Sequence, residues 1–187
     1  MIYTVECGFA DPGREAEWNA FYSLDKLPAL ISVRGFQTSQ RLRALSRNCP
    51  AYLALHTIDG PEVLTGEDYR RKGGGNFARW QQHITDWHRN LYDGLDLYDG
   101  LNGAPAVGPD EILAVSAIGP RSLIGLDLTP SAIRAVGLER FPARRWLAKL
   151  PRARLPTLDQ LPEDVQVYEA MTAQLTKAGD DLTMPAR

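Results

Sequence analysis

Two residues in the first sixty positions of this chain are candidates for moving protons. Lys26 is a candidate base or charge-stabilising group, because burial lowers the pKa of a lysine toward neutrality. His56 is a candidate for proton exchange, because histidine titrates near neutral pH. A solvated lysine on a helix surface and a hydrogen-bonded structural histidine are the alternatives at these two positions.

Aromatic residues accompany this pair. Trp18 and Tyr22 are one helical turn apart and could line a flat pocket for an aromatic substrate, although such pairs also occur in ordinary cores. Tyr52 alternates onto the same strand face as His56, and Asp25 adjoins Lys26. We therefore predict that Trp18, Tyr22, Asp25 and Tyr52 bind the substrate.

Other combinations of reactive residues fit known sites poorly. His83 and His88 are five residues apart, so on a helix they diverge by roughly 140° and cannot share a metal ion. Cys7 and Cys49 lack the C-x-x-C spacing of a zinc or redox site. We predict no metal site and no cofactor.

Two charged stretches could bind phosphate or nucleic acid. Residues 70–76 read Arg-Arg-Lys-Gly-Gly-Gly-Asn but lack the ending of a P-loop, which favours a flexible loop or a lid. Residues 134–154 are basic, yet the chain has a pI near 5.9 and no recognisable nucleic-acid-binding motif. We predict a solvated face or subunit contact there, and no nucleic-acid partner.

The elements that must position these residues follow from residue alternation and helix signals. Strands are predicted at 2–9, 36–45 and 51–58. A helix over 13–33 begins after Asp11-Pro12 and is interrupted near Pro28. Helical segments are predicted at 62–72 and again from Asn76, where Phe77, Trp80, Ile84, Trp87 and Leu91 form one helical stripe.

The second half of the chain is less regular. A linker over 91–110 precedes predicted strands at 111–118 and 165–175, with a short helix at 130–136 and a basic strand or helix at 138–150. Segments 24–45 and 126–148 echo one another weakly, which suggests a shortened repeat. We expect a ferredoxin-like α/β-barrel unit at 1–100, and at 101–187 a shortened second repeat or an extension that completes the sheet.

The order strand, helix, strand, strand, helix, strand predicts an α+β fold with a ferredoxin-like antiparallel sheet and helices on one face. The uncovered face would pair with a second sheet, as in a dimeric α/β barrel. Over residues 1–95 the chain resembles the EthD-like branch of that superfamily, through Trp18 with Tyr22, Leu27-Pro28, Val33-Arg34-Gly35-Phe36, Arg41, Arg43 and Tyr52-Leu53-Ala54-Leu55. In the family's Tyr-Asp-x-Glu-His segment, Lys26 stands where the imidazole is usual.

The resemblance implies a cofactor-independent enzyme acting on an apolar or aromatic, catabolic or polyketide-type substrate by proton transfer. Lys26 would then lie at the barrel mouth, and the face of Tyr52 and His56 would look into the barrel. A non-catalytic ligand-binding or stress-associated barrel with a packed interior is the alternative. A haem protein with His56 or His83 as axial ligand is a more distant one.

Bulk properties set the remaining expectations. A net charge of −2 and a hydrophobic fraction of 44% are typical of a globular protein without bulk attraction to nucleic acid or anionic membrane. Residues 1–9 lack the basic start of a signal peptide, and no apolar run is long enough to span a bilayer. We predict a cytoplasmic protein that binds a small molecule, and a homodimer, since the second half is too short for a full copy.

Overall fold

The computed structural model describes residues 1–74, 78–92, 106–116, 136–140 and 143–178. The N-terminal half has four strands, namely β1 (Ile2–Phe9), β2 (Phe36–Ala44), β3 (Tyr52–Ile58) and β4 (Ile84–Tyr92). Its helical segments are α1 (Glu15–Phe21), a π-helical turn (Tyr22–Lys26), α2 (Leu27–Ile31), α3 (Glu67–Tyr69) and a second π-helical turn (Arg70–Gly74). Short 3-10 turns occupy Pro61–Leu64 and Gln81–His83.

The C-terminal half contributes the remaining strands. They are β5 (Glu111–Ser116), β6 (Val136–Arg140), β7 (Ala143–Pro151), β8 (Val165–Ala170) and the short β9 (Leu175–Thr176). Two 3-10 turns, Arg152–Arg154 and Leu158–Gln160, lie between β7 and β8. The expected helix at 130–136 and terminal tail, and most of the linker, lie outside the described residues.

All described strands belong to one sheet with the order β4-β1-β3-β2-β8-β5-β7-β6, and β9 pairs with β2. Every pairing is antiparallel. The first four strands have the ferredoxin-like order, in which the first strand lies between the third and fourth. Strands β8-β5-β7-β6 repeat that order, so the two halves join edge to edge through β2 and β8.

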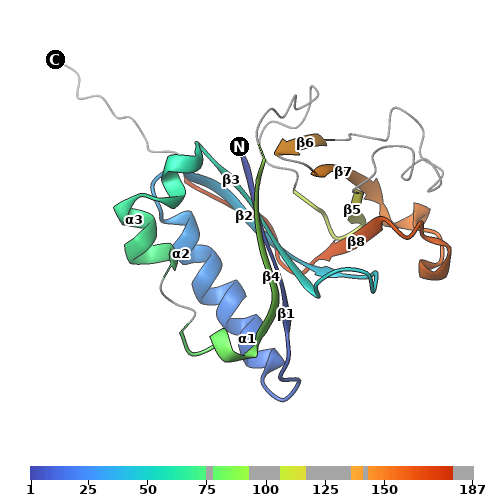
Figure 1. The fold of residues 1–187 in the computed structure, drawn as a ribbon, viewed down its shortest axis with the longest axis horizontal. Coiled ribbons are helices and arrows are strands. Elements are labelled where there is room, and N and C mark those ends of the chain that lie inside the picture. The colour runs from blue at the N-terminus through green and yellow to red at the C-terminus, as the bar shows by residue number, and fades with distance from the viewer. Residues whose placement is uncertain (75–77, 93–105, 117–135, 141–142, 179–187) are drawn as a thin grey trace.

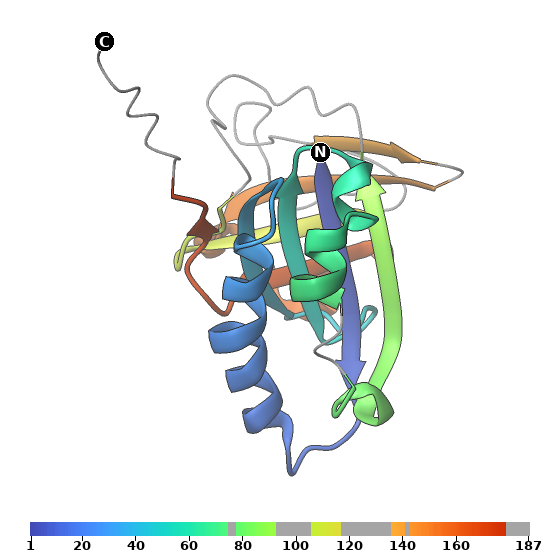
Figure 2. The same cartoon turned by 90° about the vertical axis from the view of Figure 1, so that its left-hand side faces the viewer.

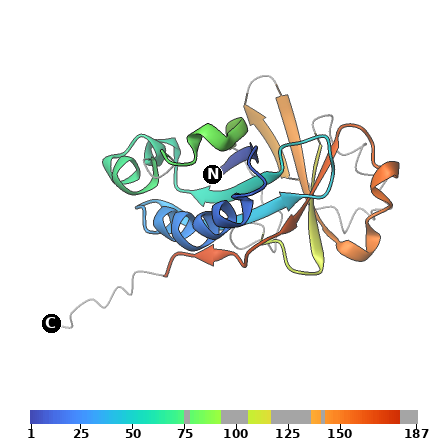
Figure 3. The same cartoon turned by 90° about the horizontal axis from the view of Figure 1, so that it is seen from below.

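The sheet curls into a barrel-like shape. Helices α1, α2 and α3 cover one face of the N-terminal strands, and the C-terminal strands lie beyond the other face (Figures 1 and 3). The end strands β4 and β6 also approach each other. The predicted α+β fold, with helices on one side of the antiparallel N-terminal strands, is confirmed. On the other side lie the C-terminal strands of the same sheet rather than a separate second sheet.

Two apolar cores flank the N-terminal strands. The helix-covered core contains Trp18, Tyr22, Leu27, Leu30 and Phe36. The lumen core combines both halves of the chain, and its members are Ile2, Leu42, Leu53, Leu55, Val107, Leu113, Val115 and Tyr168. β3 carries apolar residues on both faces. One face packs against the helices, and the other packs against residues of the C-terminal half.

The helical layer is irregular where the sequence predicts an interruption. Pro28 lies in the first turn of α2, where its missing N–H costs no helical hydrogen bond. The π-helical turn Tyr22–Lys26 comes directly before α2, and the side chains of Tyr22 and Lys26 are buried. Such turns insert one residue and rotate the following side chains, and they recur at functional sites. Figure 2 shows this layer in front of the strands.

Gly35 allows the chain to turn from α2 into β2. Its φ of +91° lies in the region that favours glycine, and an added Cβ would collide with Val63. The approach of the 3-10 turn Pro61–Leu64 to the start of β2 therefore depends on a glycine here.

The predicted helix from Asn76 onward is wrong over residues 84–92. This stretch is strand β4, which pairs with β1 from Ile2↔Tyr92 to Phe9↔Ile84. Ile84, Trp87 and Leu91 fit a helical stripe, but Trp87, Arg89 and Leu91 also alternate as in a strand. The strand forms because it pairs with the free edge of β1, which satisfies the backbone N–H and C=O groups of that edge.

The face of the N-terminal strands away from the helices, for which a second chain was expected, is covered by C-terminal strands of the same chain, which continue the sheet from β2. β2 pairs with β8 through Leu42↔Ala170, Arg43↔Glu169 and Ala44↔Tyr168, and with β9 through Thr38↔Thr176. An uncovered sheet face therefore no longer argues for a homodimer. No helix in the described part of the chain is long and apolar enough to cross a lipid bilayer.

Candidate functional site

The candidate residues meet between the N-terminal strands and the helices that cover them. Cross-strand pairing aligns Tyr3 with His56 and His56 with Ser39, and it aligns Ala54 with Arg41 one step along. The helices contribute Trp18, Tyr22 and Lys26 from above. The site is therefore a buried layer that joins the sheet and the helices.

Lys26 is buried in this layer, with 2% of its surface exposed. Its ammonium group donates a hydrogen bond to the carbonyl of Gly73, in the second π-helical turn. A Cβ at Gly73 would lie 2.7 Å from the ring of Tyr69 and 3.0 Å from Leu30, so glycine permits this approach. Burial lowers the pKa of Lys26 to about 8, which makes the neutral amine accessible near physiological pH.

His56 is fully buried beneath the same layer. Its Nδ1 lies 2.8 Å from the hydroxyl of Ser39, and its ring stacks on Tyr3 with centroids 5.5 Å apart. Among the described residues its Nε2 has no hydrogen-bond partner. Burial, together with the nearby charge of Lys26, lowers the pKa of His56 to about 3, so its imidazole is neutral at physiological pH.

Tyr52 is tied to helix α1. Its hydroxyl donates to Glu15 Oε1 at 2.5 Å and accepts from Asn19 Nδ2 at 3.1 Å. Burial and the bond to Glu15 raise the pKa of Tyr52 to about 12. Tyr52 therefore holds a neutral phenol and orients the first turns of α1 against β3.

Trp18 and Tyr22 form the aromatic wall of the layer. Their rings meet edge to face at 5.2 Å, and Trp18 also stacks on Phe9 at 5.3 Å and meets Trp80 at 5.6 Å. Burial is the main reason that the pKa of Tyr22 is raised, so Tyr22 remains a neutral phenol. This wall is aromatic and buried, and it lies in the same layer as Lys26 and His56.

Arg41 is the residue of this layer to which the sequence reasoning gave no role. It lies on β2, is 1% exposed, and contacts the ring faces of Tyr22 and Tyr52. An arginine within a strand, on the same face as Ser39 and next to Ala54, is the signal that could have identified it. The resemblance noted above includes Arg41 but assigns it no chemistry.

The structure gathers five of the six predicted site residues and separates one. Lys26, His56, Trp18, Tyr22 and Tyr52 all lie in the buried layer, whereas Asp25 is exposed on the outer side of the π-helical turn. Burial of Lys26 excludes the alternative of a solvated lysine on a helix surface. Hydrogen bonding of His56 to Ser39 agrees with either a structural or a reactive histidine.

The expected placement at the barrel mouth and lumen is wrong. Tyr52 and His56 face the helices, while Leu53 and Leu55 face the lumen. Both strand faces are apolar, so alternation alone cannot tell which one the helices cover. The crossover from β1 through α1 and α2 to β2 determines it.

A hollow with a volume of about 650 Å³ lies elsewhere, beside the β2–β3 turn and the start of β8. Its lining includes Leu45, Arg47, Asp159, Leu161 and Val165. None of the predicted site residues lines it. Within the described residues no three His, Cys, Asp or Glu side chains are grouped as a metal site would require.

The fold is α+β, with an antiparallel, barrel-like sheet. Two solved structures are similar over nearly the whole chain. One is an anthrone oxidase-like protein with 11% identity and a TM-score of 0.51, covering 95% of this chain and 92% of the other. The other is a "putative monooxygenase" from Lactobacillus acidophilus NCFM with 7% identity and a TM-score of 0.51, covering 95% and 96%. At these identities the likeness establishes the fold.

No protein-family model matches the sequence. No curated protein matches it either.

Proposed function

We propose that this protein is a cofactor-independent enzyme that removes a proton from an aromatic, polyketide-type small molecule in the layer between the N-terminal sheet and its helices. The observation that carries this proposal is a buried lysine with a pKa of about 8 close to a neutral histidine whose Nε2 has no partner among the described residues. Paired groups with displaced pKa values are typical of catalytic sites.

The two groups take complementary roles. Neutral Lys26 is the better proton acceptor, because its pKa lies near the working pH whereas that of His56 is far below it. His56 uses Nε2 to hydrogen-bond the substrate oxygen. The assignment reverses the roles expected from sequence, where Lys26 stabilises charge and His56 exchanges the proton.

The aromatic wall supports a flat substrate. Trp18 and Tyr22 offer stacking and edge contacts, and the similar structures carry names that refer to anthrone oxidation and to monooxygenation. For an anthrone-type substrate, Lys26 would take a proton from the methylene carbon, and the resulting carbanion would react with molecular oxygen. Loss of water then gives the ketone, so one methylene and one O2 yield one carbonyl and one water.

The test is turnover of hydroxylated anthrones, followed by oxygen uptake and visible absorbance. We expect Lys26→Met to reduce turnover by roughly a hundredfold or more and His56→Gln by roughly tenfold or more. Lys177→Met is the matched control, because Lys177 also donates to a backbone carbonyl, that of Val33, but lies outside the layer. Equal turnover in wild type, Lys26→Met and His56→Gln would falsify the proposal.

A non-catalytic ligand-binding barrel is the second candidate, and the apolar packing of the lumen favours it. In that case aromatic ligands would raise the melting temperature without being converted. Absorbance in the Soret region of the purified protein tests the haem alternative, for which His83 is an unfavourable ligand because Gln82 and Arg14 already contact its Nε2.

A further inference from the structure

Arg41 has an unusual environment for a buried charge. Its guanidinium carbon lies 4.1 Å from the ring centre of Tyr22, 4.4 Å from that of Tyr52 and 5.2 Å from that of Trp18. The electron-rich faces of these rings attract a cation and hold the planar group in a fixed orientation. Arg41 is therefore a rigid, preorganised positive group inside the aromatic wall.

The hydrogen-bonding capacity of Arg41 is mostly unused. Nη2 donates to Asn19 Oδ1 at 2.9 Å, while Nε and Nη1 have no partner among the described residues. Buried donors without partners are rare in folded proteins, because each loses its hydrogen bonds to water. Two such donors on one buried cation indicate a position that a hydrogen-bond acceptor completes.

The charge of Arg41 is also unmatched. Arg41 is buried, and no carboxylate in the described part of the chain forms an ion pair with it. Glu15 is a carboxylate whose charge influences the pKa of Arg41, but its Oε1 accepts a hydrogen bond from the hydroxyl of Tyr52. An anionic oxygen would supply both the missing acceptor and the missing charge.

We infer that Arg41 is an anion-binding subsite and that the substrate carries a carboxylate or phenolate oxygen on an aromatic ring. The inference rests on the proposed function only in placing the substrate in this layer. Arg41 binds the anionic oxygen through Nε and Nη1, and Tyr22 and Trp18 contact the attached ring. This anchor holds the substrate with its reactive carbon toward Lys26.

The test compares 1-naphthoate with its neutral isostere 1-naphthamide by isothermal titration calorimetry, without any turnover. We expect the wild-type protein to bind naphthoate at least tenfold more tightly than naphthamide. Arg41→Met should bring this ratio close to one, whereas Arg43→Met, which changes an exposed arginine two residues along β2, should leave it unchanged. A wild-type ratio near one, or no binding of either compound, overturns the inference.

A second variant keeps the test decisive if Arg41→Met does not fold. Asn19→Asp places a carboxylate beside Nη2 with almost no change in shape, so it should weaken naphthoate binding at least tenfold and leave naphthamide binding unchanged. Unaltered naphthoate binding in Asn19→Asp counts against the subsite. If Lys26→Met loses turnover while the wild type binds naphthoate and naphthamide equally, the proposed function stands and this inference is wrong. If the naphthoate preference depends on Arg41 but no anthrone is turned over, this inference stands and the proposed function is wrong.

Discussion

The two halves of the chain share a strand order and differ in what covers it. The N-terminal strands β4-β1-β3-β2 are covered by helices, and the layer between them holds Lys26, Arg41 and His56. The outer face of β8-β5-β7-β6 carries the apolar cluster Ile112, Ala114, Leu150, Val165 and Val167, against which Leu45, Leu155 and Leu161 pack. The N-terminal half therefore carries the candidate site residues, and the C-terminal half supplies the strands that lie beyond its other face.

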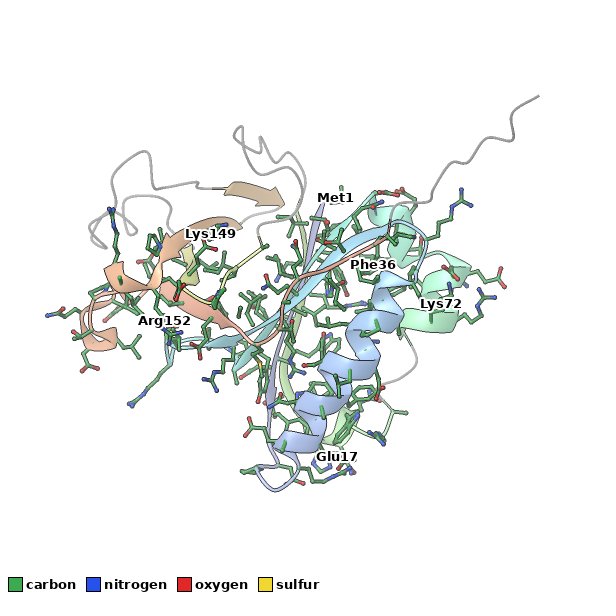
Figure 4. All side chains as sticks on the ribbon, turned by 180° about the vertical axis from the view of Figure 1, so that it is seen from behind. Met1, Glu17, Phe36, Lys72, Lys149 and Arg152 are labelled. Atoms are coloured by element: carbon green, nitrogen blue, oxygen red, sulfur yellow. The ribbon has the colours of Figure 1, made fainter. Side chains whose placement is uncertain are left out.

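The junction between the halves also differs from the site. Glu169 of β8 accepts from Arg43 of β2 and from Arg152 after β7, each at 2.5 Å. Figure 4 shows Arg152 and Lys149 in the C-terminal half, away from Glu17 of α1. Here the buried charge is matched within the chain, whereas Arg41 has no such match among the described residues. The matched charges at the junction fit a structural role, and the unmatched charge of Arg41 fits the anion-binding subsite that we propose.

The largest expected effect concerns the chemistry of the N-terminal half. Because burial places the pKa of Lys26 at about 8, the neutral base is lost as the pH falls below that value. We expect kcat/KM on an anthrone substrate to fall about tenfold per pH unit below pH 8 and to level off above it. A pH profile of initial rates measures this, and a flat profile between pH 6 and 9 would contradict Lys26 as the base.

The next largest effect is a loss of stability, which tests whether the two halves of the chain fold together. Leu55 packs in the lumen against residues of both halves, so Leu55→Ala should lower the free energy of unfolding by about 2–5 kcal/mol. Urea unfolding followed by circular dichroism and by tryptophan fluorescence should give one coincident transition. Leu24→Ala, at a side chain 74% exposed, is the control and should change little. Separate transitions for the two probes would show that the halves are independent.

The smallest effect is a loss of stability expected at the junction between β2 and β8. Glu169→Gln removes the negative charge between Arg43 and Arg152, and we expect a loss of about 1–3 kcal/mol in the free energy of unfolding at pH 7. Its hydrogen bonds with these arginines keep the pKa of Glu169 below the ordinary 4.5. The carboxylate therefore stabilises the fold above pH 4.5, and the difference from wild type should shrink as the pH falls further.

Size-exclusion chromatography of the same variant addresses assembly. Since β8 already pairs with β2, we propose that one chain closes the barrel by itself, so wild type and Glu169→Gln should both elute as monomers. A concentration-dependent dimer in the wild type would restore the original expectation of a homodimer.

Much of the N-terminal fold was predictable because its signals are local. Strands β1, β2 and β3 alternate clearly, and Pro28 marks an interruption that the structure realises as a π-helical turn just before α2. The same alternation placed Tyr52 and His56 on one strand face, and helical spacing brought Trp18 and Tyr22 together. Strand β4 was missed because its apolar residues fit a helix as well as a strand, and only the free edge of β1 selects between them.

The sequence by itself determined which residues share a strand face or a helix turn, because these relations depend on periodicities of the backbone. Tertiary structure decided that the helices cover the face of His56, that Lys26 reaches the carbonyl of Gly73, and that β8 occupies the edge of β2. It also decided that Arg41 is buried among aromatic rings with two donors lacking partners among the described residues. Such relations join residues distant along the chain, and the burial that shifts their pKa values exists only once the layers have packed.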